Sequence, residues 1–106
     1  MTEFNREATE ARVAEVMTKA NLLAWLKTQD PETTYNYFNN RDCLLARYSK
    51  AMGITPQHSS VGSGYVRAGD GNELIDISRE FTDLIYAGFG VQTYAEKIAY
   101  LESLPD

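Results

Sequence analysis

The chain has 106 residues, with 15 acidic and 10 basic side chains, a net charge of −5 and an apolar fraction of 43%. This length is typical of one domain, and the ordinary composition argues against extended disorder. The single cysteine cannot form an internal disulfide, and the opening residues MTEFNREATEAR contain no apolar leader. No apolar run approaches the roughly 20 residues of a membrane helix. We therefore expect one cytoplasmic domain over residues 1–106, with no membrane association.

The negative charge is concentrated in the second half of the chain. Residues 1–53 contain seven acids and seven bases, whereas residues 54–106 contain eight acids and three bases. Nucleic-acid binding through phosphate neutralisation requires a basic patch, and the sequence shows none. We therefore expect no direct nucleic-acid partner, and interpret the acidity as favouring either solubility or a basic protein partner.

The N-terminal half is expected to be helical. Apolar residues recur at helical spacing between residues 7 and 28, which predicts one long amphipathic helix. Asp30-Pro31-Glu32 is typical of a helix start, because proline fits the first helical position and acids favour the N-terminal end. This signal predicts a short second helix through Tyr35, Tyr37 and Phe38.

A third helix is expected to begin within Asn39–Asp42, where Asn39 and Asp42 resemble a capping arrangement. Gly53 would supply its left-handed C-cap. Apolar residues at helical spacing predict its buried side, which consists of Cys43, Leu44, Leu45, Tyr48, Ala51 and Met52.

The second half is expected to be mixed. Residues 54–64 (ITPQHSSVGSG) predict an internal loop, and residues 65–68 and 73–77 flank an Asp-Gly turn that predicts a β-hairpin. Ser78 predicts the cap of a following helix, and Thr93-Tyr94-Ala95-Glu96 is a capping box that predicts a last helix. The expected fold class is therefore α+β, mainly helical with one β-hairpin, in the order α-α-α-β-β-α-α.

Cys43 is the first candidate for chemistry. Backbone N–H groups at a helix N-terminus stabilise a thiolate, and a histidine can act as its base. The only histidine is His58, in the expected loop. Asp42 disfavours a thiolate through its negative charge, and cysteine is among the residues most often buried. We therefore expect Cys43 to be a packing residue, and keep a small thiol enzyme using Cys43 with His58 as an alternative.

Metal and nucleotide sites are not supported by any motif. One cysteine and one histidine cannot supply a structural zinc site. Asp70-Gly71-Asn72 fails the calcium-loop pattern, because the position of its glutamate ligand holds Phe81. Gly62-Ser63-Gly64 lacks the third glycine of a dinucleotide fingerprint, since Arg67 stands there. We therefore expect no metal and no cofactor.

The strongest functional signal is a run of five acids within 14 positions, opposed only by Arg67 and Arg79. We interpret it as a contact surface for a basic protein groove, and the alternative is the solvated side of a hairpin and helix. Three of the acids would share a helix face if the helix after Ser78 extended back to residue 76. The candidate partner-binding residues are Asp70, Glu73, Asp76, Glu80 and Asp83, and no catalytic residue is expected.

The run Tyr35-x-Tyr37…Asp42-Cys43-Leu44-Leu45-Ala46-x-Tyr48…Gly53 resembles a pattern in small uncharacterised bacterial and phage proteins. The resemblance covers about 20 residues and implies no catalytic residue. It implies a mobile-element origin, and small acidic phage proteins often bind and block host machinery such as defence nucleases.

The sequence thus predicts a non-enzymatic acidic interaction protein. Its expected partner is a protein with a basic surface, such as a nucleic-acid-handling host protein that it would inhibit. Besides the thiol enzyme, a homo-oligomeric structural module remains an alternative.

Overall fold

The computed structural model describes residues 5–36, 42–55, 61–62, 64–69, 73–87 and 91–105. Within these ranges the chain forms a small, compact α+β domain with five helices and two small antiparallel sheets. The expected α+β class is confirmed, but the order of elements differs from the prediction. Among the described residues no helix is both long and apolar enough to cross a membrane.

The prediction of one long helix over residues 7–28 is wrong, because the chain forms two helices there. α1 spans Arg6–Val16 and α2 spans Lys19–Leu26. Thr18 begins α2 as its N-cap, and its hydroxyl accepts a hydrogen bond from the backbone N–H of Asn21 at 3.2 Å. The Tyr48 hydroxyl donates to the carbonyl of Val16 and holds the end of α1.

The short second helix is also wrong, because β1 (Thr34–Asn36) stands in its place. β1 pairs antiparallel with β5 (Val91–Thr93), which the sequence did not predict. The Asp30 carboxylate accepts a hydrogen bond from the backbone N–H of Glu32. Asp30-Pro31-Glu32 therefore forms a turn and not the predicted start of a helix. Tyr37 and Phe38 lie outside the described residues.

The third helix is present but begins later than predicted. α3 spans Leu44–Ala51, and Cys43 rather than a residue of 39–42 is its N-cap. Its predicted apolar face is largely confirmed, since Leu44, Leu45 and Tyr48 are fully buried. Gly53 adopts a φ of 73°, as expected for a left-handed C-cap.

The predicted hairpin is confirmed as β3 (Tyr65–Ala68) and β4 (Glu73–Asp76). The predicted loop over residues 54–64 is wrong in part, because β2 (Val61–Gly62) pairs with β3 and completes a three-stranded sheet. Residues 56–60 and 63 of that loop lie outside the described part of the chain.

Both C-terminal helices follow their predicted caps. α4 spans Arg79–Tyr86, and the Ser78 hydroxyl accepts the backbone N–H of Phe81 at 3.2 Å. α5 spans Tyr94–Ser103 and begins with the full capping box of Thr93 and Glu96.

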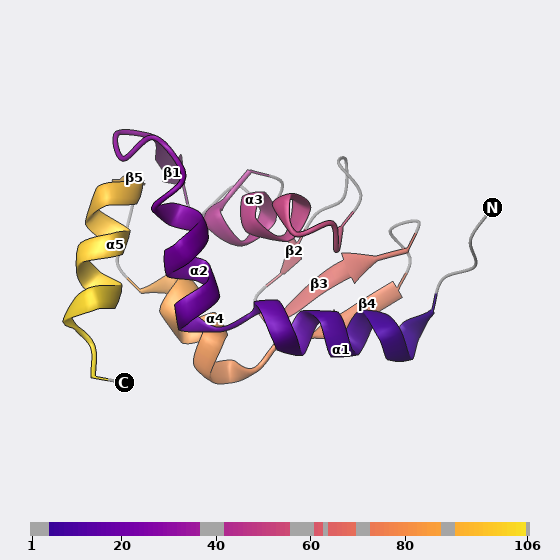
Figure 1. The fold of residues 1–106 in the computed structure, drawn as a ribbon. Helices are drawn as coiled ribbons and strands as arrows, with labels where there is room; N and C mark the ends of the chain where they lie inside the picture. The colour runs from indigo at the N-terminus through magenta and orange to yellow at the C-terminus, as the bar shows by residue number, and fades with distance from the viewer. Residues whose placement is uncertain are drawn as a thin grey trace.

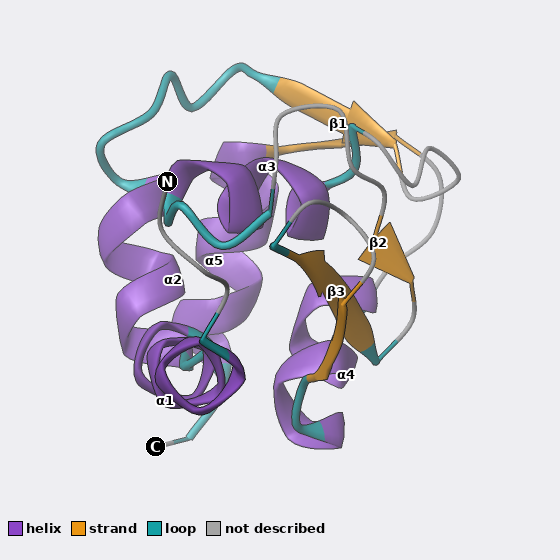
Figure 2. Cartoon of the chain, turned by 90° about the vertical axis from the view of Figure 1, so that its right-hand side faces the viewer, coloured by secondary structure: helices purple, strands orange, loops and turns teal. Residues whose placement is uncertain are grey.

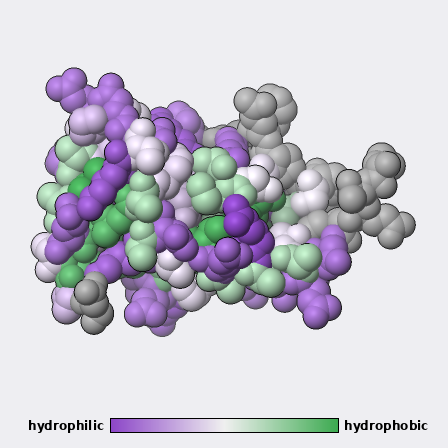
Figure 3. Space-filling view, in the orientation of Figure 1, coloured by the Kyte–Doolittle hydropathy of each residue, from purple (hydrophilic) through white to green (hydrophobic). Residues whose placement is uncertain are grey.

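The elements enclose one core between two groups. α1 runs beside β4, while α2 packs against α5, and the two packed pairs lie at opposite ends of the molecule (Figure 1). A view along α1 shows α2 and α5 on one side and the three-stranded sheet with α4 on the other (Figure 2). Most of the visible surface is hydrophilic, and hydrophobic residues gather near the junction of α1 and α2 and over α2 and α5 (Figure 3). The space between α1 and α4 is the feature that matters for function.

Candidate functional site

A groove of about 700 Å³ lies between α1 and α4 and is closed at one end by the residues after α5. We call it the α1–α4 groove. It is lined by Glu10, Val13, Ala14, Met17, Thr18 and Lys19 from the N-terminal segment, by Asp76, Ser78, Glu80, Phe81 and Leu84 from β4 and α4, and by Leu104 and Pro105.

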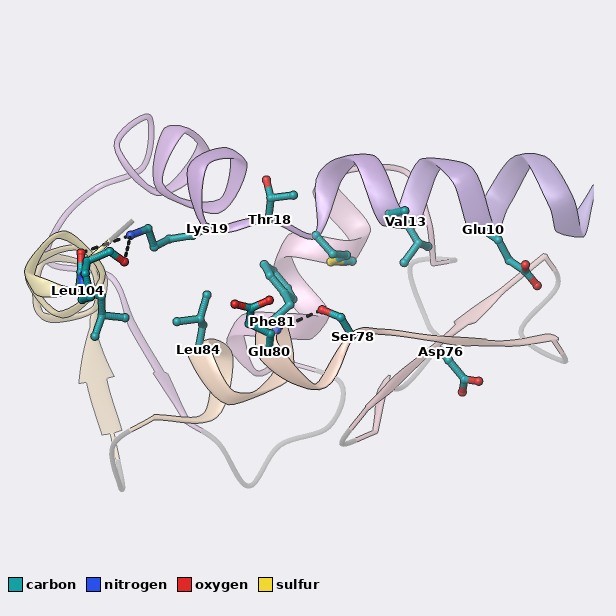
Figure 4. Close-up of a pocket in the computed structure, with 13 residues that line it drawn as sticks. Glu10, Val13, Thr18, Lys19, Asp76, Ser78, Glu80, Phe81, Leu84 and Leu104 are labelled. Carbon is teal, nitrogen blue, oxygen red and sulfur yellow. Dashed lines mark hydrogen bonds between the residues drawn. The ribbon is translucent and has the colours of Figure 1, made fainter.

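The walls of the α1–α4 groove are apolar along its middle. Val13 points from α1 into the groove, and Phe81 and Leu84 point toward it from α4 (Figure 4). Val13 and Phe81 are nearly fully buried, while Leu84 is only partly buried against the core. The apolar surface that a partner can cover therefore comes from the partly buried Leu84 and the exposed Ala14, with Leu104 and Pro105 at the closed end, while Val13 and Phe81 form the floor beneath.

The hydroxyl groups that line the groove already serve the fold. Thr18 caps α2 and Ser78 caps α4, each by accepting a backbone N–H at 3.2 Å. Lys19 Nζ lies 3.4 Å from the Leu104 carbonyl and 3.3 Å from the Pro105 carbonyl, so it ties the C-terminal segment to the start of α2 (Figure 4). These polar groups therefore shape the groove rather than converge on a space inside it.

Carboxylates stand at the edge of the groove. Glu10 is ion-paired with Arg6 at 2.8 Å. Asp76 ends β4 and Glu80 lies in the first turn of α4, and both side chains are exposed. Within the described part of the chain, neither Asp76 nor Glu80 pairs with a basic side chain. The edge is therefore net acidic beside the apolar walls.

The structure divides the five predicted acidic residues. Asp76 and Glu80 both line the α1–α4 groove, at separate points on β4 and α4 (Figure 4), whereas Asp83 is exposed on α4 outside the groove lining. Glu73 is ion-paired with Arg6 at 3.1 Å. Asp70 lies outside the described residues.

The shared helix face suggested for Asp76, Glu80 and Asp83 is wrong. α4 begins at Arg79, and Asp76 belongs to strand β4. Ser78 separates β4 from α4 as the N-cap of that helix. Its hydroxyl accepts the Phe81 backbone N–H, which has no acceptor within the first turn of the helix. Asp76 and Glu80 therefore reach the groove from two different elements.

Cys43 is buried, with 2% of its surface exposed, and its side chain makes no capping hydrogen bond to α3. The neighbouring Asp42 instead binds Arg47, whose Nε lies 3.0 Å from Oδ1. This hydrogen bond lowers the pKa of Asp42 below its usual value. His58, the other half of the proposed thiol site, lies outside the described residues. In the described ranges no three His, Cys, Asp or Glu side chains gather as metal ligands.

The sequence interpretation identified the acids but not the groove. Val13 and Met17 belong to the apolar residues at helical spacing in the first predicted helix, and Phe81 and Leu84 lie in the helix that the Ser78 cap predicts. Apolar residues at helical spacing were the available signal, but only the tertiary structure shows that α1 and α4 face the same space.

Comparison with protein-family models, curated proteins and solved structures gives no match. The fold and the groove define a small α+β domain that carries an acid-edged apolar groove between two helices.

Proposed function

We propose that this protein is a non-enzymatic interaction protein that binds a basic protein partner. One observation carries the proposal: the exposed carboxylates of Asp76 and Glu80 border the apolar α1–α4 groove. Apolar contacts supply the buried centre of a protein interface, and charged groups at the rim select the partner and accelerate association.

A partner that handles nucleic acid has the required chemistry. Such a protein carries Lys and Arg residues that neutralise phosphates, and the same surface attracts a carboxylate cluster. Occupying that surface would block nucleic-acid binding. The proposed biological role is therefore inhibition of a nucleic-acid-handling host protein, and this step rests on charge complementarity.

The test begins with capture from extract of the native host, followed by purification of the captured protein. Affinity is then measured for the wild type and for the double variant Asp76→Lys/Glu80→Lys. We expect the dissociation constant to rise about tenfold or more in the double variant, and to rise when salt increases from roughly 50 to roughly 300 mM. Capture alone does not support the proposal.

The matched control is Glu15→Lys/Glu32→Lys, which reverses the same number of exposed charges away from the α1–α4 groove. It should bind within about threefold of the wild type, since long-range steering alone changes little at physiological salt. The proposal is contradicted if both double variants bind the captured protein with equal affinity, or if binding does not respond to salt.

A further inference from the structure

We infer that the segment of the partner that fills the α1–α4 groove is a short amphipathic helix with leucine-like residues on one face and lysine or arginine beside them. This inference rests on the proposed function and deepens it by naming the form of the bound segment. It follows from what the groove walls offer to a bound backbone and to a bound charge.

The apolar middle of the groove, between α1 and α4, offers no row of unpaired backbone hydrogen-bonding groups. Its walls are these two helices, whose interior backbone groups are already paired within each helix. β4 is the edge strand of its sheet, but it lines the groove only with its last residue, Asp76, and its Leu74 carbonyl already accepts a hydrogen bond from Arg6 Nη2 at 2.8 Å. An extended segment would place unpaired backbone N–H and C=O groups against the apolar side chains of Ala14 and Leu84, which is costly. A helix pairs its own backbone, and so it can present only side chains to the apolar walls.

The charges select a cationic segment over a second copy of this chain. Asp76 and Glu80 stand at the edge of the groove, where Glu10 is already paired with Arg6 and the lining cation Lys19 already contacts two carbonyls. The chain itself carries a net charge of −5, so a second copy would bring further negative charge to this edge. A basic amphipathic helix instead complements both the apolar walls and the acids.

A small polar ligand fits less well. Small-molecule sites orient their ligands with a few convergent polar groups inside an apolar cavity. Here the hydroxyls of Thr18 and Ser78 already cap helices, and the remaining charges lie at the edge. The groove therefore recognises an apolar surface with flanking positive charge.

Two labelled synthetic peptides of about 15 residues, or roughly four helical turns, test the inference. They share one composition of leucine, alanine and lysine. One places leucines at helical spacing, and the other alternates leucine with polar residues as in a strand. Fluorescence anisotropy should show that the wild type binds the helix-spaced peptide at least about tenfold more tightly than the alternating peptide. This ratio corresponds to about 1.4 kcal/mol of binding free energy.

Two alanines of α1 provide a matched pair of variants. Ala14 lines the groove and Ala8 does not, and both are exposed on the helix. Ala14→Arg places bulk and positive charge in the groove and should weaken binding of the helix-spaced peptide about tenfold or more, whereas Ala8→Arg should leave it within about twofold. Both variants keep a good helix former at the site, and circular dichroism checks their folding.

Equal binding of the two peptides, no binding of either, or indifference to Ala14→Arg would overturn the inference. Light scattering of the wild type and of Ala14→Arg tests whether a second copy of this chain occupies the groove. A dimer that forms in the wild type and not in Ala14→Arg would show that it does, and would overturn the inference. If Asp76→Lys/Glu80→Lys abolishes binding of the captured protein while Ala14→Arg does not, the proposed function stands and the helical segment does not. If neither variant changes the affinity for the captured protein, both the proposed function and the helical segment are rejected.

Discussion

The side-chain nitrogen of Lys97 lies 2.8 Å from the carbonyl oxygen of Leu84, and 3.2 Å from each of the carbonyls of Ile85 and Ala87. α4 has no basic residue in its own last turn, so Lys97 of α5 supplies the donor for its terminal carbonyls. The Lys97 side chain is buried to do so, with 1% of the residue exposed. Lys19 differs, because it contacts the carbonyls of Leu104 and Pro105, which come just after α5 and not within that helix.

The first prediction concerns Lys97 and pH. Burial lowers the pKa of Lys97 from its ordinary 10.5 to about 8, so between these values the unfolded chain binds more protons than the folded chain. The contribution of Lys97 to the free energy of unfolding therefore rises as pH increases from about 8 to 10.5. Urea unfolding at pH 7.5, 8.5 and 9.5, each value approximate, should show this rise in the wild type and a flatter profile in Lys97→Met.

Lys97→Met also removes the donor shared by three carbonyls, which should destabilise the fold at neutral pH by about 1–3 kcal/mol. Lys27→Met is the control, because Lys27 forms an exposed ion pair with Glu102. That change should cost less than about 1 kcal/mol and leave the pH profile unaltered. Parallel pH profiles for Lys97→Met and the wild type would contradict the prediction.

The second prediction concerns the break between α1 and α2. Tyr48 is fully buried, and its hydroxyl donates to the Val16 carbonyl, which also accepts the N–H of Thr18 at 2.9 Å. Tyr48→Phe keeps the ring and removes only the hydroxyl, so we expect a loss of about 1 kcal/mol in the free energy of unfolding. The urea midpoint should fall without a change in slope.

Tyr100→Phe is the matched control for Tyr48→Phe, since Tyr100 is among the exposed large side chains. Its effect should stay within about 0.5 kcal/mol. If both substitutions change the free energy of unfolding by the same amount, the hydrogen bond from Tyr48 to Val16 does not stabilise the end of α1.

Local signals in the sequence predicted what depends on a few neighbouring residues. The Ser78 cap, the Thr93–Glu96 capping box and the positive φ of Gly53 are all found in the structure. Thr18 was available as a further cap signal, with Asn21 three residues later, but the continuous apolar stripe favoured one helix. Such short-range features depend on backbone groups that lie within one turn of each other.

The errors arise where distant segments meet. Thr34–Asn36 forms a strand because it pairs with Val91–Thr93, and the carbonyls of Pro31 and Thr33 accept the N–H groups of Ala95 and Tyr94. These partners override a helix signal that is only a weak preference. For the same reason the acids of the candidate site could be chosen from the sequence, whereas the α1–α4 groove beside them could not.

The third prediction separates a packing cysteine from a reactive one. Cys43 is buried at the start of α3, so iodoacetamide can reach it only when the surrounding structure opens. Alkylation of the folded protein should be slower than in urea by on the order of 100-fold, which corresponds to an opening free energy of about 2.7 kcal/mol. Mass spectrometry over a range of pH measures the rates. Fast alkylation of the folded protein near neutral pH would instead favour the thiol-enzyme alternative, and a His58→Gln variant would then show whether the histidine is its base.

The fourth prediction concerns Arg47, which joins three elements. Its Nε and Nη2 bind the two carboxylate oxygens of Asp42 at 3.0 and 3.1 Å, and its Nη1 lies 2.7 Å from the Thr34 carbonyl and 3.4 Å from the Tyr94 hydroxyl. Lysine cannot make the paired contact with Asp42 and reach β1 at once. Arg47→Lys should therefore lower the free energy of unfolding by about 1–2 kcal/mol and the melting temperature by roughly 5–10 °C.

Asp42→Asn distinguishes the ion pair from the contact with β1. The Asp42 side chain is 61% exposed, so its charge should contribute less than about 1 kcal/mol, and most of the stabilisation should come from the Thr34 carbonyl. The Arg47 hydrogen bond lowers the pKa of Asp42, so the pair stabilises the fold above the ordinary value of 3.8 and ceases to do so as pH falls below it. Thermal melts between pH 3 and 6, both approximate, should therefore show a smaller acid-induced loss in Asp42→Asn than in the wild type. If Asp42→Asn costs as much as Arg47→Lys at neutral pH, the local ion pair at the start of α3, rather than the contact with β1, supplies the stabilisation.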